Sequence, residues 1–273
     1  MFKFWEWTKD TWTLVVAVIA LVQPWVVGAY KRLFKAGAVD INETALIEVG
    51  YSPFGATIGL QGTLRSRDRD LFIKFINLTL VKQRDNSKYQ FDWVVFRTAK
   101  TIIGQSGEVA LDVPSSFMIA TAQPHRYNIV FSDTKLFQEI RPTLEGIRQS
   151  WLTYLQGIGQ SDELEEYLTS ANPALKRKLL KSLKRSYDKF SILPEQVNSL
   201  TILEKAFYWE PGIYRLSIHV GTTRPDRHYS KSWSFTLLEA DVNNLRNNVI
   251  TIMEETCGIQ QVGQYMFIYT AYA

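Results

Sequence analysis

The stretch 71–95 reads LFIKFINLTLVKQRDNSKYQFDWVV, and it predicts two β-strands joined by a polar turn. In its second half, apolar residues alternate with polar ones from Tyr89 to Val95, as expected of a half-buried strand. In its first half the apolar face changes near Phe75, which predicts a β-bulge that restores the register. Residues 84–88 between the halves are polar and favour a hairpin. The stretch therefore indicates antiparallel β-structure.

Similar alternation occurs on both sides of this stretch. Thr57–Arg65 precedes it, Tyr127–Phe131 follows it, and Tyr214–Val220 with Trp233–Leu237 reads as a further hairpin. The short segment Trp209–Leu216 is similar to the turn-and-strand segment common in immunoglobulin-like domains, although no family is assigned from it. These patterns predict a mainly β fold with helices, built as an immunoglobulin-like β-sandwich of two sheets that carries a helical insertion.

Helical spacing replaces the alternation between Pro142 and Phe190. We expect Pro142 at the first position of a helix that ends near Gly157. Ser161 is expected to cap an acidic second helix, and Asn172 a third helix with proline at its first position.

A further amphipathic helix is expected to begin at Asp241 and to end at Gly258. The predicted organisation is a membrane anchor at 1–35, a first part of the sandwich at 36–134, a helical insertion at 135–205 and a second part of the sandwich with one helix at 206–273.

The amino-terminal segment 12–30 reads WTLVVAVIALVQPWVVGAY and contains no charged residue. As a helix it would be about 28 Å long at ~1.5 Å per residue, which is close to the ~30 Å hydrocarbon thickness of a bilayer. Pro24 predicts a kink. We therefore expect a single-pass transmembrane helix, with the lipid bilayer as its partner. The expected anchor residues are Trp12, Leu14, Val15, Val18, Leu21, Trp25 and Tyr30.

Two other readings of this segment stay open. It could be a cleaved signal peptide with Val27-Gly28-Ala29 before the cut, or an interfacial or packed helix. The leader MFKFWEWTKD is atypical of a signal peptide because it carries two acidic residues. Lysine and arginine are balanced across the segment, so the positive-inside rule does not orient it.

The strongest surface candidate is the segment 172–190, NPALKRKLLKSLKRSYDKF, which predicts a basic amphipathic helix. Its leucines are expected to pack on the insertion, with the lysines solvated or paired with the acidic helix. Alternatively, its basic side lies on the anionic cytoplasmic leaflet, or contacts a protein partner or nucleic acid. The leaflet reading favours a cytoplasmic domain. The candidate contact residues are Lys176, Arg177, Lys178, Lys181, Lys184 and Arg185.

A second candidate is the loop expected around Gly221–Lys231. Loops on a rigid scaffold often carry recognition, and arginine suits phosphate or carboxylate groups. The alternative is a solvated hairpin tip. The candidate residues are Arg224, Arg227, His228 and Lys231.

Composition and motifs exclude several function classes. The 273 residues are 46% hydrophobic and 21% charged, which is typical of a globular chain, and a net charge of +4 does not indicate a nucleic-acid binder. The single cysteine, Cys257, excludes an intramolecular disulfide and a thiolate metal cluster. The chain has no HExxH, phosphate-loop, GxSxG or ordered GxGxxG motif. We therefore assign no catalytic, cofactor-binding or metal-binding residue.

These observations favour a non-enzymatic, membrane-anchored interaction, sensor or assembly module. Its expected partner is another protein or a second copy of itself, and nucleic acid is not expected. Two alternatives are a membrane-associated, hydrolase-like enzyme whose site is assembled from distant residues, and an envelope-facing ligand-recognition domain.

Overall fold

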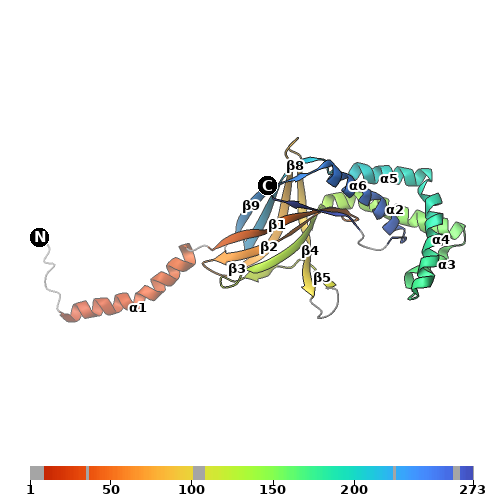
Figure 1. Ribbon diagram of the computed structural model, residues 1–273. Helices are drawn as coiled ribbons and strands as arrows, with labels where there is room; N and C mark the ends of the chain where they lie inside the picture. The colour runs from red at the N-terminus through yellow and green to blue at the C-terminus, as the bar shows by residue number, and fades with distance from the viewer. Residues whose placement is uncertain (1–8, 35–36, 101–107, 224–225, 261–264, 273) are drawn as a thin grey trace.

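The computed structural model describes residues 9–34, 37–100, 108–223, 226–260 and 265–272. The chain divides almost equally between strand (40%) and helix (42%), and the strands form one large, curled antiparallel sheet. The helical elements other than the first gather at one end of this sheet, and the amino-terminal helix α1 extends from the other end (Figure 1).

The sheet contains ten strands in the described part of the chain, and its main path has the order β10-β1-β2-β7-β4-β3-β8-β9, with β5 paired to β4 and β6 to β3. The expected arrangement of two separate sheets is therefore wrong. Long, twisted and bulged strands let one sheet curl around its own core, so that a second sheet is not needed. The strands are β1 Ala38–Ser52, β2 Gly55–Arg67, β3 Leu71–Lys82, β4 Lys88–Lys100, β5 Glu108–Asp112, β6 Phe117–Ile119, β7 His125–Ser132, β8 Gly212–Thr223, β9 Asp226–Leu237 and β10 Phe267–Ala271.

The hairpin and the bulge predicted from 71–95 are confirmed. Strands β3 and β4 pair directly, and Asn86 in the turn between them adopts a positive φ of 59°. The register of β3 against β8 shifts between Ile73 and Phe75. A Cβ at Gly221 on β8 would lie 2.4 Å from the Phe75 ring, so glycine leaves the space that the displaced ring fills. The bulge is thus accommodated on both strands.

The two edges of the curled sheet meet along a seam, where side chains join β9 to β1 and to β10. The Tyr229 hydroxyl donates to the Gly37 carbonyl at 2.7 Å. Lys231 Nζ donates to the Ile41 carbonyl at 2.9 Å and forms an ion pair with Glu43 at 2.6 Å. Side chains thus satisfy edge groups that a neighbouring strand would otherwise bond.

Helices cover one end of the core. Helix α6 packs on β1 and α2 packs on β2. Trp209, just before β8, is fully buried and donates its indole N–H to the Gly50 carbonyl at 3.1 Å. Trp151 of α2 is buried among the helices against Phe190. The helices of this group are α2 Thr134–Gly157, α3 Ser161–Thr169, α4 Pro173–Ser191, α5 Pro194–Ala206 and α6 Glu239–Thr256.

Of the four predicted helix starts, only the one at Asn172 is confirmed. Helix α2 begins at Thr134, with Pro142 inside it, because Asp133 caps it by accepting a hydrogen bond from the Leu136 amide at 3.1 Å. Ser161 is the first residue of α3 and not its cap. Asn172 does cap α4, and its Oδ1 accepts from the Ala174 amide at 3.0 Å.

Helix α6 starts two positions before the expected Asp241, at Glu239. Asp241 Oδ2 accepts a hydrogen bond from the Leu238 amide at 2.9 Å, so the carboxylate stabilises the first turn from inside the helix.

Helix α1 spans Lys9–Phe34 and continues through Pro24. The side chains from 16 to 29 are all exposed, and the helix stands apart from the sheet (Figure 1). Among the described residues, no helix is both long enough and apolar enough to span a membrane. The predicted transmembrane helix is therefore not supported. Trp12, Leu14, Val15 and Tyr30 also belong to α1.

Candidate functional site

The site begins where β4 separates from β7. A bulge between Trp93 and Val95 bends β4, and its ladder with β7 ends at the pair Phe96–Ile129. Beyond that point β4 pairs with β5, which projects from the sheet in Figure 1. The β7 residues 125–128 continue to pair with β2, but β4 no longer lies beside them. We call the resulting gap between residues 125–128 and 112–117 the β7 opening.

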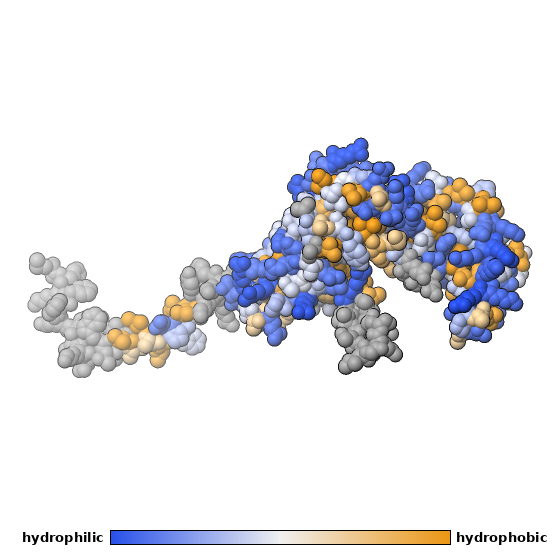
Figure 2. Space-filling view, in the orientation of Figure 1, coloured by the Kyte–Doolittle hydropathy of each residue, from blue (hydrophilic) through white to orange (hydrophobic). Residues whose placement is uncertain are grey.

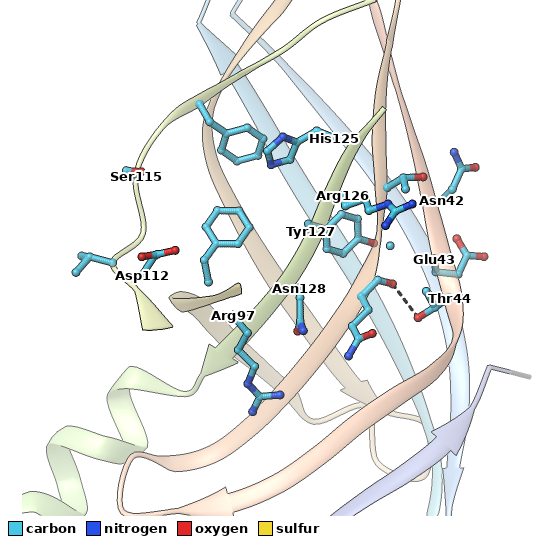
Figure 3. Close-up of a pocket in the computed structure, with 16 residues that line it drawn as sticks. Asn42, Glu43, Thr44, Arg97, Asp112, Ser115, His125, Arg126, Tyr127 and Asn128 are labelled. Atoms are coloured by element: carbon cyan, nitrogen blue, oxygen red, sulfur yellow. Dashed lines mark hydrogen bonds between the residues drawn. The ribbon is translucent and has the colours of Figure 1, made fainter. Parts of the chain in front are cut away.

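The β7 opening contains a cavity of about 1050 Å³. This volume is slightly above the range of ~300–1,000 Å³ for small-molecule pockets. Figure 3 shows side chains from several strands converging on it. The lining residues are Asn42, Glu43, Thr44, Gln61, Gly62, Thr63, Phe96, Arg97, Asp112, Val113, Ser115, Phe117, His125, Arg126, Tyr127 and Asn128.

One wall of the cavity is aromatic. The ring of His125 stacks on Phe117 with centroids 4.4 Å apart, and Phe96 lies 5.7 Å from Phe117. Trp93 packs edge-on against Phe96 at 4.7 Å. Burial lowers the pKa of His125, so this imidazole is neutral at neutral pH. The wall therefore presents aromatic, uncharged surface.

The cavity also has polar atoms without partners. The Tyr127 side chain is 4% exposed, and neither its hydroxyl nor Asn128 Oδ1 forms a hydrogen bond in the described structure. Burial raises the pKa of Tyr127, so its hydroxyl keeps its proton. A Cβ at Gly62 would lie 2.6 Å from the Tyr127 oxygen, so glycine is needed at this close approach. Buried polar atoms usually have partners, which makes these two candidates for ligand contact.

The two faces of β7 give the cavity two different sides. Successive side chains of a strand point to opposite faces. His125 and Tyr127 therefore share the inner face, whereas Arg126 and Asn128 share the outer face. The pairing of Arg126 with Thr63 extends the polar outer side onto β2.

Most charges near the cavity are already engaged. Arg97 forms an ion pair with Glu48 at 2.7 Å, and Glu43 forms one with Lys231 at 2.6 Å. Arg126, by contrast, is exposed and makes no hydrogen bond or ion pair with the described residues. Its guanidinium is therefore available to an anionic group.

The geometry does not form a recognisable catalytic constellation. Ser115 and His125 both line the cavity but share no hydrogen bond, which a nucleophile and its base would need. Cys257 lies away from this cavity at the end of α6, and burial raises the pKa of its thiol. His219 is half-buried beside Thr79, 3.1 Å from its hydroxyl. Within the described residues, no group of three potential metal ligands is found.

The basic side chains of α4, except that of Lys176, form a continuous exposed arc along one side of the helix. Leu179 and Leu183 are buried on the opposite side of the helix. Lys176 is half-buried with its ammonium group 5.9 Å from the Tyr167 ring. No ion pair joins α4 to the acidic α3 in the described structure, and Figure 2 shows hydrophilic residues interspersed with hydrophobic ones at this end of the molecule. The exposed basic residues are Arg177, Lys178, Lys181, Lys184, Arg185 and Lys189.

The position of α4 bears on its expected contact with the membrane surface. Helices α1 and α4 lie at opposite ends of the molecule (Figure 1). A bilayer that surrounds α1 would therefore not lie beside the basic side of α4.

The predicted recognition loop is largely strand. Because β9 begins at Asp226, Arg227, His228 and Lys231 are all strand residues. Lys231 belongs to the seam, and the His228 ring lies 5.6 Å from Phe75. Arg224 lies outside the described residues. Strands β8 and β9 pair as far as Thr223 and Asp226, so most of the expected loop is hydrogen-bonded strand.

Sequence reasoning missed the β7 opening, because its lining residues come from separate strands and from the β5–β6 connection. One signal was available in the strand residues 125–128, where polar side chains occupy both faces. No protein-family model, curated protein or solved structure matches the chain. A functional proposal therefore rests on the geometry of the molecule.

Proposed function

We propose that this chain is a non-enzymatic binding module attached to a lipid bilayer through α1, as a single-pass anchor. The observation that carries this proposal is the uncovered apolar surface of α1. Val16, Val18, Ile19 and Leu21 are 60%, 53%, 60% and 73% exposed. Helical positions turn by about 100° per residue, so these four side chains point in different directions around the helix.

A helix in water normally keeps a polar side toward solvent. Helix α1 has no such side between Val16 and Val22, and the sheet does not cover it. Large uncovered apolar surfaces mark sites of protein or membrane contact. A bilayer accommodates apolar side chains in every direction around a helix, whereas a protein partner usually covers one face.

The binding role is supported by the rest of the molecule. The β7 opening has free polar groups and an aromatic wall, but no activated nucleophile. The exposed basic arc of α4 is a second surface for a protein partner, at the end that faces away from α1. A partner-binding module uses both features, whereas an enzyme would need a reactive group that the cavity does not present.

Alkaline carbonate extraction of membranes tests the anchor. The full-length chain should stay in the membrane pellet, and the double variant Val18→Lys/Leu21→Lys should be released. Ile192→Lys is a matched control, because Ile192 is also an exposed apolar residue, at 73%, but lies outside α1. Release of the unmodified chain would overturn the proposal. The cytoplasmic placement of the sheet is a separate proposal that does not depend on contact between α4 and the leaflet, and a side-selective reporter fused after Ala273 tests it.

A further inference from the structure

We propose that the β7 opening binds an extended peptide segment, which adds as a strand beside residues 125–128 and places an acidic side chain on Arg126. The inference rests on the proposed binding role and names the chemistry of the partner. Three features of β7 support the inference: the backbone edge of residues 125–128 that is unpaired in the described structure, the space beside that edge, and the different side chains on the two faces of the strand.

The backbone edge is the first step. Residues 125–128 form ladder pairs with β2 on one side only, and the β4 ladder stops at Ile129. A strand edge of four residues is about 13 Å long at ~3.3 Å per residue. Its outward N–H and C=O groups are suited to an added strand, which is a common mode of peptide recognition.

The space beside the edge is the second step. The cavity of about 1050 Å³ borders this edge and also extends over β2 and β1, and residues 112, 113, 115 and 117 line its side opposite the edge. A paired strand lies only about 4.8 Å from its neighbour, so a segment that occupies the cavity would lie within pairing distance of the edge. The aromatic wall keeps one side of the segment out of water.

The two faces set the sequence preference. Inward side chains of the peptide would meet His125 and Tyr127, and outward ones would meet Arg126 and Asn128. Arg126 is a cation without an ion pair in the described structure, so an acidic peptide side chain is favoured at the outward position opposite it. The best occupant therefore alternates apolar and acidic residues, with its apolar side chains inward.

Fluorescence anisotropy with the full-length chain in detergent micelles tests this preference. The probe is a fluorescein-labelled peptide that alternates valine and glutamate, and the comparison peptide alternates valine and lysine. We expect the glutamate peptide to bind at least about tenfold more tightly, because one well-placed charge pair contributes on the order of a tenfold change. Arg126→Glu should reverse the order of the two peptides. Arg215→Glu, an exposed strand arginine outside the cavity, should leave it unchanged.

Amide hydrogen exchange separates strand addition from side-chain binding. The glutamate peptide should slow exchange in residues 125–128, and a peptide with proline at its centre should not, because proline lacks the N–H that a ladder needs. Binding without this protection, or an unchanged preference in Arg126→Glu, would overturn the inference. A chain that stays in the membrane pellet but binds neither peptide contradicts only this inference. A chain that is released by carbonate but binds the glutamate peptide contradicts only the anchor.

Discussion

Arg97 on β4 and Glu48 on β1 form a two-pronged ion pair, at 2.7 Å from Nη1 to Oε2 and 2.8 Å from Nη2 to Oε1. Strands β2 and β7 lie between β1 and β4 in the sheet, so this contact crosses two intervening strands. Glu48 is only 7% exposed and also accepts a hydrogen bond from the Tyr269 hydroxyl at 3.3 Å. The pair therefore fixes the end of β4 at the border of the β7 opening.

Removing one partner of this ion pair should lower the free energy of unfolding. Arg97→Ala leaves the buried Glu48 carboxylate without its cation, and we expect a loss of about 3 kcal/mol in the free energy of unfolding. The double variant Arg97→Met/Glu48→Leu removes both charges and should recover most of that loss. Denaturant unfolding of the three proteins in detergent measures both effects. If the single and double variants were equally destabilised, the loss of stability would come from side-chain packing and not from the unpaired charge.

The seam should weaken in acid. Burial acts to raise the pKa of Glu43, but hydrogen bonds, first of all from Lys231, and the Lys231 charge together outweigh it and hold this pKa below its usual value. A carboxyl group with a depressed folded-state pKa stabilises the fold above its unfolded-state pKa, and that contribution is lost as pH falls through the folded-state value. Stability should therefore decline as pH falls below about 4.5.

Lys231→Met should reduce the Glu43 contribution to this decline in stability, because it removes the main side-chain partner that lowers the pKa of Glu43. Thermal unfolding midpoints between about pH 5 and pH 3 measure the change. Lys178→Met serves as the control, since Lys178 is exposed on α4 and has no ion pair in the described structure. An identical acid profile for Lys231→Met and the unmodified chain would contradict the assignment.

Asn248 should contribute more to the free energy of unfolding than the size of its side chain indicates. It is 1% exposed, its Nδ2 donates to the carbonyls of Tyr51 and Met266 at 3.0 and 2.8 Å, and its Oδ1 accepts from the Met266 amide at 2.9 Å. Asn248→Ala leaves these buried groups unpaired and should cost about 3 kcal/mol. Asn247→Ala, at an exposed neighbouring position, should stay within about 0.5 kcal/mol of the unmodified chain. Denaturant unfolding that shows equal effects of the two substitutions would contradict this role.

The basic arc of α4 should not hold the chain on the membrane. Lys181→Glu/Arg185→Glu reverses two exposed charges that have no ion pairs in the described structure, so stability should change by less than about 0.5 kcal/mol. Retention in the carbonate pellet should also be unchanged, because α4 lies at the end opposite α1. Release of this variant by carbonate would contradict the prediction and would show that α4 contributes to membrane retention.

Local features of this protein could be predicted from the sequence, because they depend on residues a few positions apart. The hairpin of 71–95, the bulge near Phe75 and the cap at Asn172 are all confirmed. The start of α2 was mispredicted because Pro142 resembles an N-terminal signal, whereas the capping carboxylate of Asp133 lies further back. These elements follow from side-chain periodicity and local hydrogen bonding.

Only the tertiary structure decided that the strands form one curled sheet, that β4 separates from β7, and that Arg97 meets Glu48 across two strands. Alternation indicates which face of a strand is buried, but it contains no information on which strand lies beside it. Strand order, sheet curvature and the β7 opening depend on long-range pairing and accumulated twist, which are properties of the whole sheet. Residues 61–63 and 127–128 lay in predicted strands, but their convergence on one cavity with Arg126 and the β5–β6 connection results from that long-range pairing.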